Sequence, residues 1–469
     1  MAKRKQTRRD FLRLTVVGAA GAALVACQGA APEGAGGTAG EAGGAAGEAV
    51  APPAAGAEPA SLLFYWLTGD MSWVERNKPL MAKFVEENPG YSVEQLLPPS
   101  GMSAIEKFQA MIAGGEPPDI ADTGMDQYSF ADRDVFRDLQ PLIERDGADL
   151  SDEDPIAMQS FYHPGKNIQF GYPHSMNSAV MYFNKDLFDA AGEPYPPQSW
   201  DDPSWTWEAY KDVAKRMTQD TDGDGRPDQW GSSAPLYVYN APFIYGGAWT
   251  NEDQTEVLLD RPESIKGFQL YQDAMYTDAY APTPEAAQLM QSGFMSGRMA
   301  MSFGGTWDVA GFRTIQDFGW DAAPCPRDSA RPEDAPRGND VFPDALVMSS
   351  VKQVEQSWTL LKWMLLNEEN HLYWSWDVLG MFPSRSSLVP EYLRRAQESL
   401  PGIAWEVIAE SWAHGNLDIL FINSNYSEID SFIGANIWDQ LTLASMTAEE
   451  AITQALPDLE PLILSGAPK

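Results

Sequence analysis

After residue 60, the spacing of apolar residues alternates between the pattern of a buried strand and the pattern of a helix. The apolar run from Ser61 to Leu67 predicts a buried strand. The apolar residues that follow it at helical spacing are Trp73, Leu80, Met81, Phe84 and Val85. Residues 93–97 predict a second strand, residues 105–112 a second helix, and Ile120 begins a third strand. Strands that alternate with helices predict an α/β fold with a mostly parallel sheet, in which ligands bind beyond the carboxyl ends of the strands.

The N-terminal segment has the pattern of an export signal. Arg8 and Arg9 precede an apolar stretch of 13 residues, Leu14 to Ala26, which ends at Cys27. Paired arginines before a short apolar core resemble a twin-arginine signal, and small residues before a cysteine resemble a lipoprotein cleavage site. The stretch is too short to cross about 30 Å of hydrocarbon. We therefore predict that residues 1–27 form a signal and that lipid on Cys27 anchors the exported protein to the outer side of the cell membrane.

Residues 28–60 consist almost entirely of Gly, Ala, Pro and Glu. Such a segment has no large side chain to bury and cannot offset the entropy of ordering, so it predicts a flexible tether. Residues 61–469 exceed what one hydrophobic core usually supports. We therefore expect two lobes or domains after the tether.

Charge and cysteine content narrow the choice of function. The formal net charge is −35, and contact with phosphates requires clustered Lys and Arg, so we expect no nucleic-acid partner. The acidity fits a soluble secreted surface and does not identify a ligand. Cys325 is the one cysteine besides Cys27, so the exported body cannot form an internal disulfide, and we expect a packed thiol.

Several motifs follow one another along the chain. They are GGEPPDI at residues 114–120, GYP at 171–173, MYFNKDLF at 181–188, and FMSGRMAMSFGGTW at 294–307. Their order and spacing resemble the family 1 extracellular solute-binding proteins, the class that includes maltose-binding protein, from about residue 61 to residue 464. The resemblance implies a type II periplasmic-binding-protein fold, in which two α/β lobes close around a ligand by a hinge movement.

The resemblance also implies discontinuous domains and a set of partners. The chain should cross between lobes near Tyr172, Ala322 and Tyr373. Lobe one would then comprise residues 61–172 plus 322–372, and lobe two residues 173–321 plus 373–469. We expect a monomer that docks on the permease subunits of an ABC importer.

Carbohydrate ligands need flat aromatic platforms and polar groups that hydrogen-bond to hydroxyls. The candidate platforms are Trp66, Trp249, Trp307 and, in the segment that resembles the closing part of lobe two, Phe382. The candidate polar groups are Asp122, Thr123 and Asp126 after the third strand, and Tyr172, His174 and Asn177 in the hinge stretch. A tryptophan is more often a core residue than a platform, and the motif reverses this expectation for Trp307 alone. His174 fits a buried interdomain histidine equally well.

An aspartate-rich loop fits a calcium site. Asp220, Asp222, Asp224 and Asp228 occupy positions 1, 3, 5 and 9 of an oxygen-donor loop, and Arg226 offers its carbonyl at position 7. Position 12 is Gly231 in place of the usual bidentate Glu. The alternative is an acidic turn without metal. Any bound Ca²⁺ is expected to be structural, to stabilise lobe two and to leave the ligand untouched.

The function predicted from these patterns is that of an extracytoplasmic, substrate-binding lipoprotein of an ABC transporter, which binds a mono- or oligosaccharide between its lobes. One alternative keeps the fold and changes the ligand to a peptide, polyamine, phosphate ester or metal. Another is a secreted carbohydrate-active enzyme. The chain contains no G-x-S-x-G, H-E-x-x-H, C-x-x-C or phosphate-loop motif, and we identify no catalytic residue.

Overall fold

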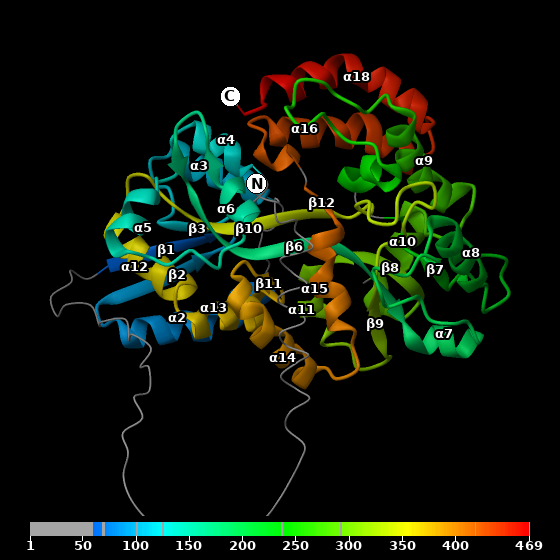
Figure 1. Cartoon of the computed structure of the whole chain (residues 1–469), viewed down its shortest axis with the longest axis horizontal. Coiled ribbons are helices and arrows are strands. Elements are labelled where there is room, and N and C mark those ends of the chain that lie inside the picture. Colours follow the sequence, from blue (N-terminus) through cyan, green and yellow to red (C-terminus); the bar gives the residue numbers. More distant parts are fainter. Residues whose placement is uncertain are drawn as a thin grey trace, which may run out of the picture.

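The computed structural model describes residues 60–67, 71–99, 102–123, 126–235, 238–290, 293–417 and 419–468 (Figure 1). The predicted signal, most of the predicted tether and Cys27 lie outside the described residues. Within these ranges, every helix is too short or too polar to pass through a lipid bilayer.

The strands form one large sheet and one small pair. The large sheet contains β1 (Ala60–Trp66), β2 (Tyr91–Leu96), β3 (Ile120–Asp122), β6 (Gly171–Asn184), β7 (Trp230–Ser232), β8 (Met299–Gly305), β9 (Trp320–Ala323), β10 (Asp340–Met348), β11 (Phe382–Pro383) and β12 (Asn416–Leu417). The small antiparallel pair consists of β4 (Tyr162–His163) and β5 (Ile168–Gln169).

Helices cover this sheet on both faces (Figure 1). Those of the first half are α2 (Met71–Glu87), α3 (Ala104–Ala113), α4 (Gln127–Asp132), α5 (Gln140–Asp146), α6 (Pro155–Ser160), α7 (Lys185–Ala191) and α8 (Trp207–Met217). Those of the second half are α9 (Pro262–Tyr276), α10 (Pro284–Met290), α11 (Val309–Phe312), α12 (Val354–Leu365), α13 (Glu368–Leu372), α14 (Val389–Ser399), α15 (Trp405–His414), α16 (Tyr426–Ile433), α17 (Asp439–Thr442) and α18 (Ala448–Ser465). The 3₁₀ and π segments include η1 (Val238–Tyr245), η3 (Thr306–Asp308), η4 (Tyr373–Leu379) and η6 (Ile419–Ile422).

The large sheet is mixed, whereas the sequence predicted a mostly parallel sheet. Its main path runs β2-β1-β3-β10-β6-β8-β7. The parallel pairs are β1 with β2, β1 with β3, β7 with β8, and β10 with β12, and the other pairs are antiparallel. Strand β10 is antiparallel to both β3 and β6 because it comes from a distant part of the chain and returns across the sheet. Local periodicity predicts the strands but carries no information on this long-range pairing.

Strands β6 and β10 connect two α/β bodies. The first part of β6 pairs with β10 and β11, and its last residues pair with β8 and β9. All 14 residues of β6 are buried, so this strand belongs to the cores on both sides. The lobe boundaries that the resemblance implies near residues 172, 322 and 373 stay predictions.

Separate hydrophobic cores lie in the two bodies. On one side, α2, α12 and η4 pack on one face of β1 and β3, and α3 and α4 cover the other face. On the other side, β6, β8, β9 and α8 surround a core that contains the buried Cys325 and the tryptophans of residues 200–207. A third core joins η1, α9, α16 and α18. Cys325 is therefore the packed thiol that the sequence predicts, and burial raises its pKa.

Candidate functional site

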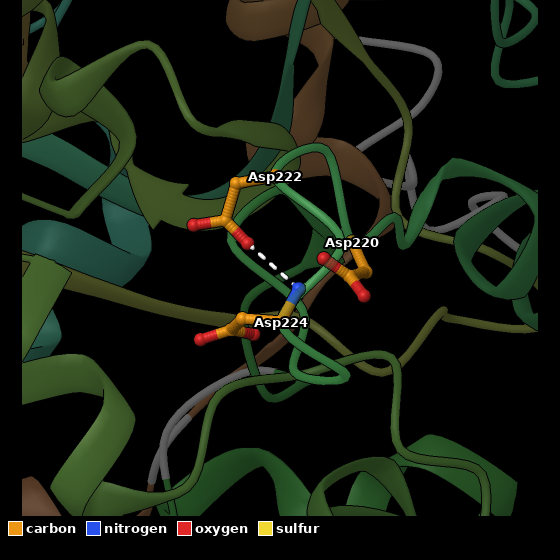
Figure 2. A group of neighbouring side chains, drawn as sticks. All are labelled: Asp220, Asp222 and Asp224. Atoms are coloured by element: carbon orange, nitrogen blue, oxygen red, sulfur yellow. Dashed lines mark hydrogen bonds between the residues drawn. The ribbon is translucent and has the colours of Figure 1, made fainter.

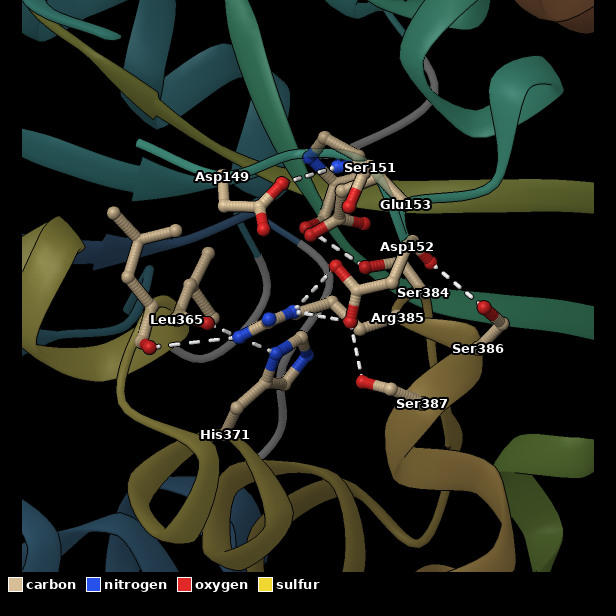
Figure 3. A network of polar contacts seen from close by, with 12 residues as sticks. Asp149, Ser151, Asp152, Glu153, Leu365, His371, Ser384, Arg385, Ser386 and Ser387 are labelled. Atoms are coloured by element: carbon tan, nitrogen blue, oxygen red, sulfur yellow. Dashed lines mark hydrogen bonds and ion pairs between the residues drawn. The ribbon is translucent and has the colours of Figure 1, made fainter. Parts of the chain in front are cut away.

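A polar network fixes the start of β6 at the junction of the two bodies (Figure 3). Arg385, which follows β11, donates from Nε to both carboxylate oxygens of Asp152, at 3.1 and 3.0 Å. Glu153 forms a backbone bridge with Arg385, and its Oε1 accepts a hydrogen bond of 2.9 Å from the hydroxyl of Tyr172 on β6. Ser384 donates from Oγ to the carbonyl of Pro173 at 3.1 Å. The junction is thus held by hydrogen bonds between three distant segments.

Glu153 makes this junction sensitive to pH. Burial raises the pKa of its carboxyl group to about 7, and the negative charge of Asp152 acts in the same direction. Hydrogen bonds from Ser384 and Tyr172 and the charge of Arg385 lower the pKa and offset part of this shift. Between the ordinary carboxyl pKa and pH 7, the folded state binds more protons at Glu153 than the unfolded state does. The free energy of unfolding therefore falls by up to about 3 kcal/mol through this group as pH rises across that window.

Replacing Glu153 by glutamine is expected to remove this part of the pH dependence, because the amide keeps the acceptor for Tyr172 without a charge. Urea unfolding at pH 5 and 7.5 should show that Glu153→Gln has a higher free energy of unfolding than the natural protein, and that this difference is larger at pH 7.5. The control is Glu391→Gln, because Arg394 lowers the pKa of Glu391 to about 2 and its contribution stays constant in this window. If the free energies of unfolding of Glu153→Gln and the natural protein differed by the same amount at both pH values, Glu153 would not be the source of this pH dependence.

Alternating side chains of β10 form the polar floor between the two bodies. Phe342 lies opposite Asn177 of β6, and Asp344 lies opposite Ser175, so these four residues share one face of the sheet. Asn177 donates from Nδ2 to Asp344 Oδ2 at 2.7 Å, and Thr306 donates to Asn177 Oδ1 at 3.3 Å. Asn177 is fully buried, and burial together with the charge of nearby Asp122 raises the pKa of Asp344 well above its ordinary value.

Three of the predicted polar residues support this floor, two from the end of β3 and one from β6. Asp122 and His174 are both buried, and the His174 Nε2 lies 3.0 Å from Asp122 Oδ1. Thr123 accepts a hydrogen bond of 2.8 Å from the amide of Ala345 and thereby ties the end of β3 to β10. These contacts fit the interpretation of His174 as a buried interdomain histidine.

Aromatic side chains continue from the floor toward the C-terminal segment. The ring of Trp307 lies 5.5 Å from that of Phe342, and Phe342 stacks on Phe421 at 4.7 Å and an interplanar angle of 12°. Phe421 in turn lies 5.7 Å from Tyr426 at the start of α16. We call Trp307, Phe342, Phe421 and Tyr426 the aromatic row. It presents several flat rings next to Asn177 and Asp344.

The sequence predicted Trp307 and missed the other three members of the aromatic row. Phe342 had a usable signal, because Asp340 and Asp344 flank it at period two in an otherwise apolar strand, which marks one polar face. Phe421 and Tyr426 had none, because they reach the site through the long-range pairing of β12 with β10.

Asp126 reaches the far end of the aromatic row from lobe one. It precedes α4, is only 2% exposed, and lies near Ser427, the neighbour of Tyr426 in α16. Burial raises the pKa of Asp126 to about 6, although Ser427 and Arg133 oppose this shift. At the other end of α4, Ser424 donates a hydrogen bond to Asp132. The two bodies therefore meet above the floor through α4 and the segment that begins α16.

Four predicted residues lie outside this cluster. Trp66 is fully buried in the core of lobe one, where it stacks on Trp374 at 5.3 Å. Trp249 is fully buried among η1, α9 and α18. Tyr172 belongs to the junction network, and Phe382 packs on Tyr392. As ligand contacts these four stay predictions, and the geometry of Trp66 and Trp249 is that of core residues.

The aspartate loop brings three carboxylates together (Figure 2). Ligand oxygens of Asp220, Asp222 and Asp224 lie within 4.8 Å of one another, and all three side chains are exposed. Asp228 is held elsewhere, because its carboxylate accepts hydrogen bonds of 2.7 to 3.0 Å from Thr221. At Gly231, a Cβ atom would lie 1.7 Å from the carbonyl oxygen of Ala214, so no side chain fits at position 12. The donors therefore fit a hard cation with part of its shell from water.

Comparison with known proteins identifies the family. The family model for bacterial extracellular solute-binding proteins matches residues 79–396. The chain belongs to this family. Among curated relatives, the maltotriose-binding protein of Pyrococcus abyssi (strain GE5 / Orsay) is 23% identical over 56% of this chain and 54% of that protein. A binding protein of Brucella abortus (strain 2308) is 30% identical over 28% of this chain and 31% of that protein. The chain thus spans about half or less of these relatives.

Solved structures of solute-binding proteins have the same fold. An ABC substrate-binding protein of Listeria monocytogenes in complex with cycloalternan has a TM-score of 0.70 at 22% identity and covers 86% of this chain and 98% of its own. The maltodextrin-binding domain of Bdellovibrio bacteriovorus bound to maltotriose has a TM-score of 0.68 at 19% identity, with 86% and 100% covered. A Mycobacterium tuberculosis protein in complex with glycerophosphocholine has a TM-score of 0.70 at 20% identity, with 86% and 98% covered. These similarities confirm the predicted two-lobed α/β fold.

Proposed function

We propose that this solute-binding protein captures a mono- or oligosaccharide between its two lobes and delivers it to an ABC importer. The observation that carries the proposal is the aromatic row, whose rings lie beside the buried amide of Asn177 and the carboxyl groups of Asp126 and Asp344. Apolar C–H faces of sugar rings pack on flat aromatic groups, and amide and carboxyl groups hydrogen-bond to sugar hydroxyls. Binding of this kind requires no catalytic group.

The proposed mechanism is closure around the ligand. Asn177 and Phe342 belong to the connecting strands, and Asp126 belongs to lobe one. Trp307 follows β8, and Tyr426 begins α16. A saccharide that touches all of them binds the closed arrangement better than an open one and therefore shifts the population toward closure. The closed form would present the outer faces of both lobes to the permease together.

A thermal-shift screen of the full chain tests the proposed ligand class. The probes are mono- and oligosaccharides, amino acids, polyamines, and glycerophosphocholine. A ligand at 100 times its dissociation constant adds about 2.7 kcal/mol to the free energy of unfolding and raises the melting temperature visibly. A shift with one class of saccharide supports the proposal. A shift with glycerophosphocholine or a polyamine, and none with any saccharide, would keep the fold and overturn the ligand class.

We also propose that lipid on Cys27 holds the protein at the extracytoplasmic face of the membrane. Replacing Cys27 by alanine in the producing cell removes the acylated thiol and is expected to move the protein from the membrane fraction to the soluble exported fraction. Replacing Cys325, which is buried and therefore closed to acylation, by serine is the matched control and should leave fractionation unchanged. Retention of Cys27→Ala in the membrane would contradict lipid anchoring.

The aspartate loop is proposed to bind one structural Ca²⁺. Calcium should raise the melting temperature and a chelator should lower it, because the ion relieves repulsion among three carboxylates that lie within 4.8 Å. Asp222→Asn should abolish the response, whereas Asp458→Asn on the exposed face of α18 should retain it. Magnesium at equal concentration controls for ionic strength. A melting temperature that calcium and chelator leave unchanged would rule the site out.

A further inference from the structure

Three buried carboxyl groups and one half-buried carboxyl group lie around the candidate ligand site. Asp344 and Asp340 share one face of β10 with Phe342, Asp308 follows Trp307, and Asp126 approaches from lobe one. Asp126, Asp340 and Asp344 are 2%, 4% and 8% exposed. Burial raises the pKa of Asp126, Asp308 and Asp340 to about 6 each, and it raises the pKa of Asp344 well above its ordinary value. An acidic environment therefore surrounds the aromatic row.

Neutral groups, and almost no cations, compensate these acids. Asp308 accepts from the amide of Gly305 at 2.8 Å, and Asp344 accepts from Asn177 at 2.7 Å. Among the described residues, the only Lys or Arg in ion-pair contact with any of the four is Arg133, at 3.7 Å from Asp126. The Arg133 side chain is 52% exposed, so solvent screens most of its charge.

Asp126, like Asp340, has a buried carboxylate oxygen without a hydrogen-bond partner. Its Oδ1 is buried and has no hydrogen-bond partner, and Arg133 lies on the side of Oδ2. A buried carboxylate oxygen without a donor is costly, because the group has lost water and gained nothing in exchange. A ligand that brings a hydroxyl or an ammonium group to Oδ1 would remove this cost. A ligand that brings an anion would increase it, because charges repel strongly where water is excluded.

We propose that the site selects its ligand by charge: it accepts neutral and ammonium-bearing saccharides and rejects those that carry carboxylate, phosphate or sulfate, with Asp126 as the main discriminating residue. This inference rests on the proposed ligand site, and it narrows the class of saccharide. Selection of this kind works by repulsion of the wrong ligand as well as by attraction of the right one. Repulsion by the acidic site would weaken the binding, and therefore the uptake, of uronates and sugar phosphates of otherwise suitable size.

The test compares affinities within matched ligand sets by calorimetry on the full chain at pH 7.5. Each set contains one neutral saccharide, its amino-deoxy derivative and its uronate, and a parallel set contains glycerol, glycerol phosphate and ethanolamine. Anionic members should bind at least about 30-fold more weakly than neutral ones, and ammonium-bearing members at least as tightly. In Asp126→Asn, the penalty for the anion should shrink about tenfold.

The control is Asp134→Asn, which makes the same change in net charge just beyond α4. The Asp134 side chain is 83% exposed, so the ratio of anionic to neutral affinity should stay as in the natural protein. Equal affinity for a uronate and its neutral counterpart would overturn charge selection and leave saccharide binding intact. Binding restricted to neutral or cationic solutes other than saccharides would support charge selection and overturn the proposed function.

Discussion

Trp307→Ala is expected to lower saccharide affinity at least about 30-fold, the loss typical of a central aromatic contact worth 2 kcal/mol or more. Trp307 is the member of the aromatic row that the family motif also marks, and it stands next to Phe342 on the polar floor. Truncation removes the flat face on which a sugar ring would pack. Calorimetric titration with the saccharide that gives the largest thermal shift measures the effect.

Two further variants separate loss of the platform from loss of the fold. Trp307→Phe keeps a smaller flat ring and should retain more affinity than Trp307→Ala. Trp438→Ala truncates a partly buried tryptophan that packs on Tyr271, in a different part of the molecule, and should leave affinity unchanged. Unchanged affinity in Trp307→Ala would show that the ligand does not use the aromatic row.

Arg385→Ala is expected to lower the free energy of unfolding by about 3 to 5 kcal/mol, as for other buried ion pairs that lose one partner. The side chains of Arg385 and Asp152 are only 11% and 19% exposed. Without Arg385, Asp152 and the buried Glu153 remain as neighbouring acids at the junction of the two bodies, with no other Lys or Arg of the described residues in ion-pair contact (Figure 3). Urea unfolding measures the loss.

The matched control is Arg394→Ala on α14. Arg394 makes ion pairs with Glu391 and Glu398, but it is exposed, so solvent already screens its contacts and the midpoint of unfolding should hardly move. Arg385→Lys should fall between the two variants, because lysine keeps the charge without the fixed Nε–H group that donates to both oxygens of Asp152. A small effect of Arg385→Ala would contradict a structural role for the junction network.

Local patterns predicted the elements of the chain better than their arrangement. The first helix was expected from Trp73 to Val85 and runs from Met71 to Glu87, because helical spacing and the stop at Asn88 act over a few residues. The last helix begins with a capping box that its residue types alone indicate, in which Thr447 and Glu450 exchange hydrogen bonds. The direction of β10 was not predictable, because it depends on pairing with β3 and β6.

The candidate site was predictable where a motif or a strand end marks it. Trp307 lies in a motif, Asn177 lies in the predicted hinge stretch, and Asp126 follows a strand end. All three lie at the junction of the two bodies. Trp66 and Trp249 have the same residue type as Trp307, and only the packed structure shows that they are fully buried in two separate cores. Composition alone cannot distinguish a platform from a core tryptophan, because both are apolar rings with one donor.

The structure of the protein in complex with the saccharide that gives the largest thermal shift would show whether the ligand binds between the lobes on the aromatic row. We expect a sugar ring packed against Trp307, hydroxyl groups within hydrogen-bond distance of Asn177 and Asp126, and lobes closed between α4 and α16. A saccharide bound on an outer face of either lobe, with the aromatic row untouched, would contradict this expectation.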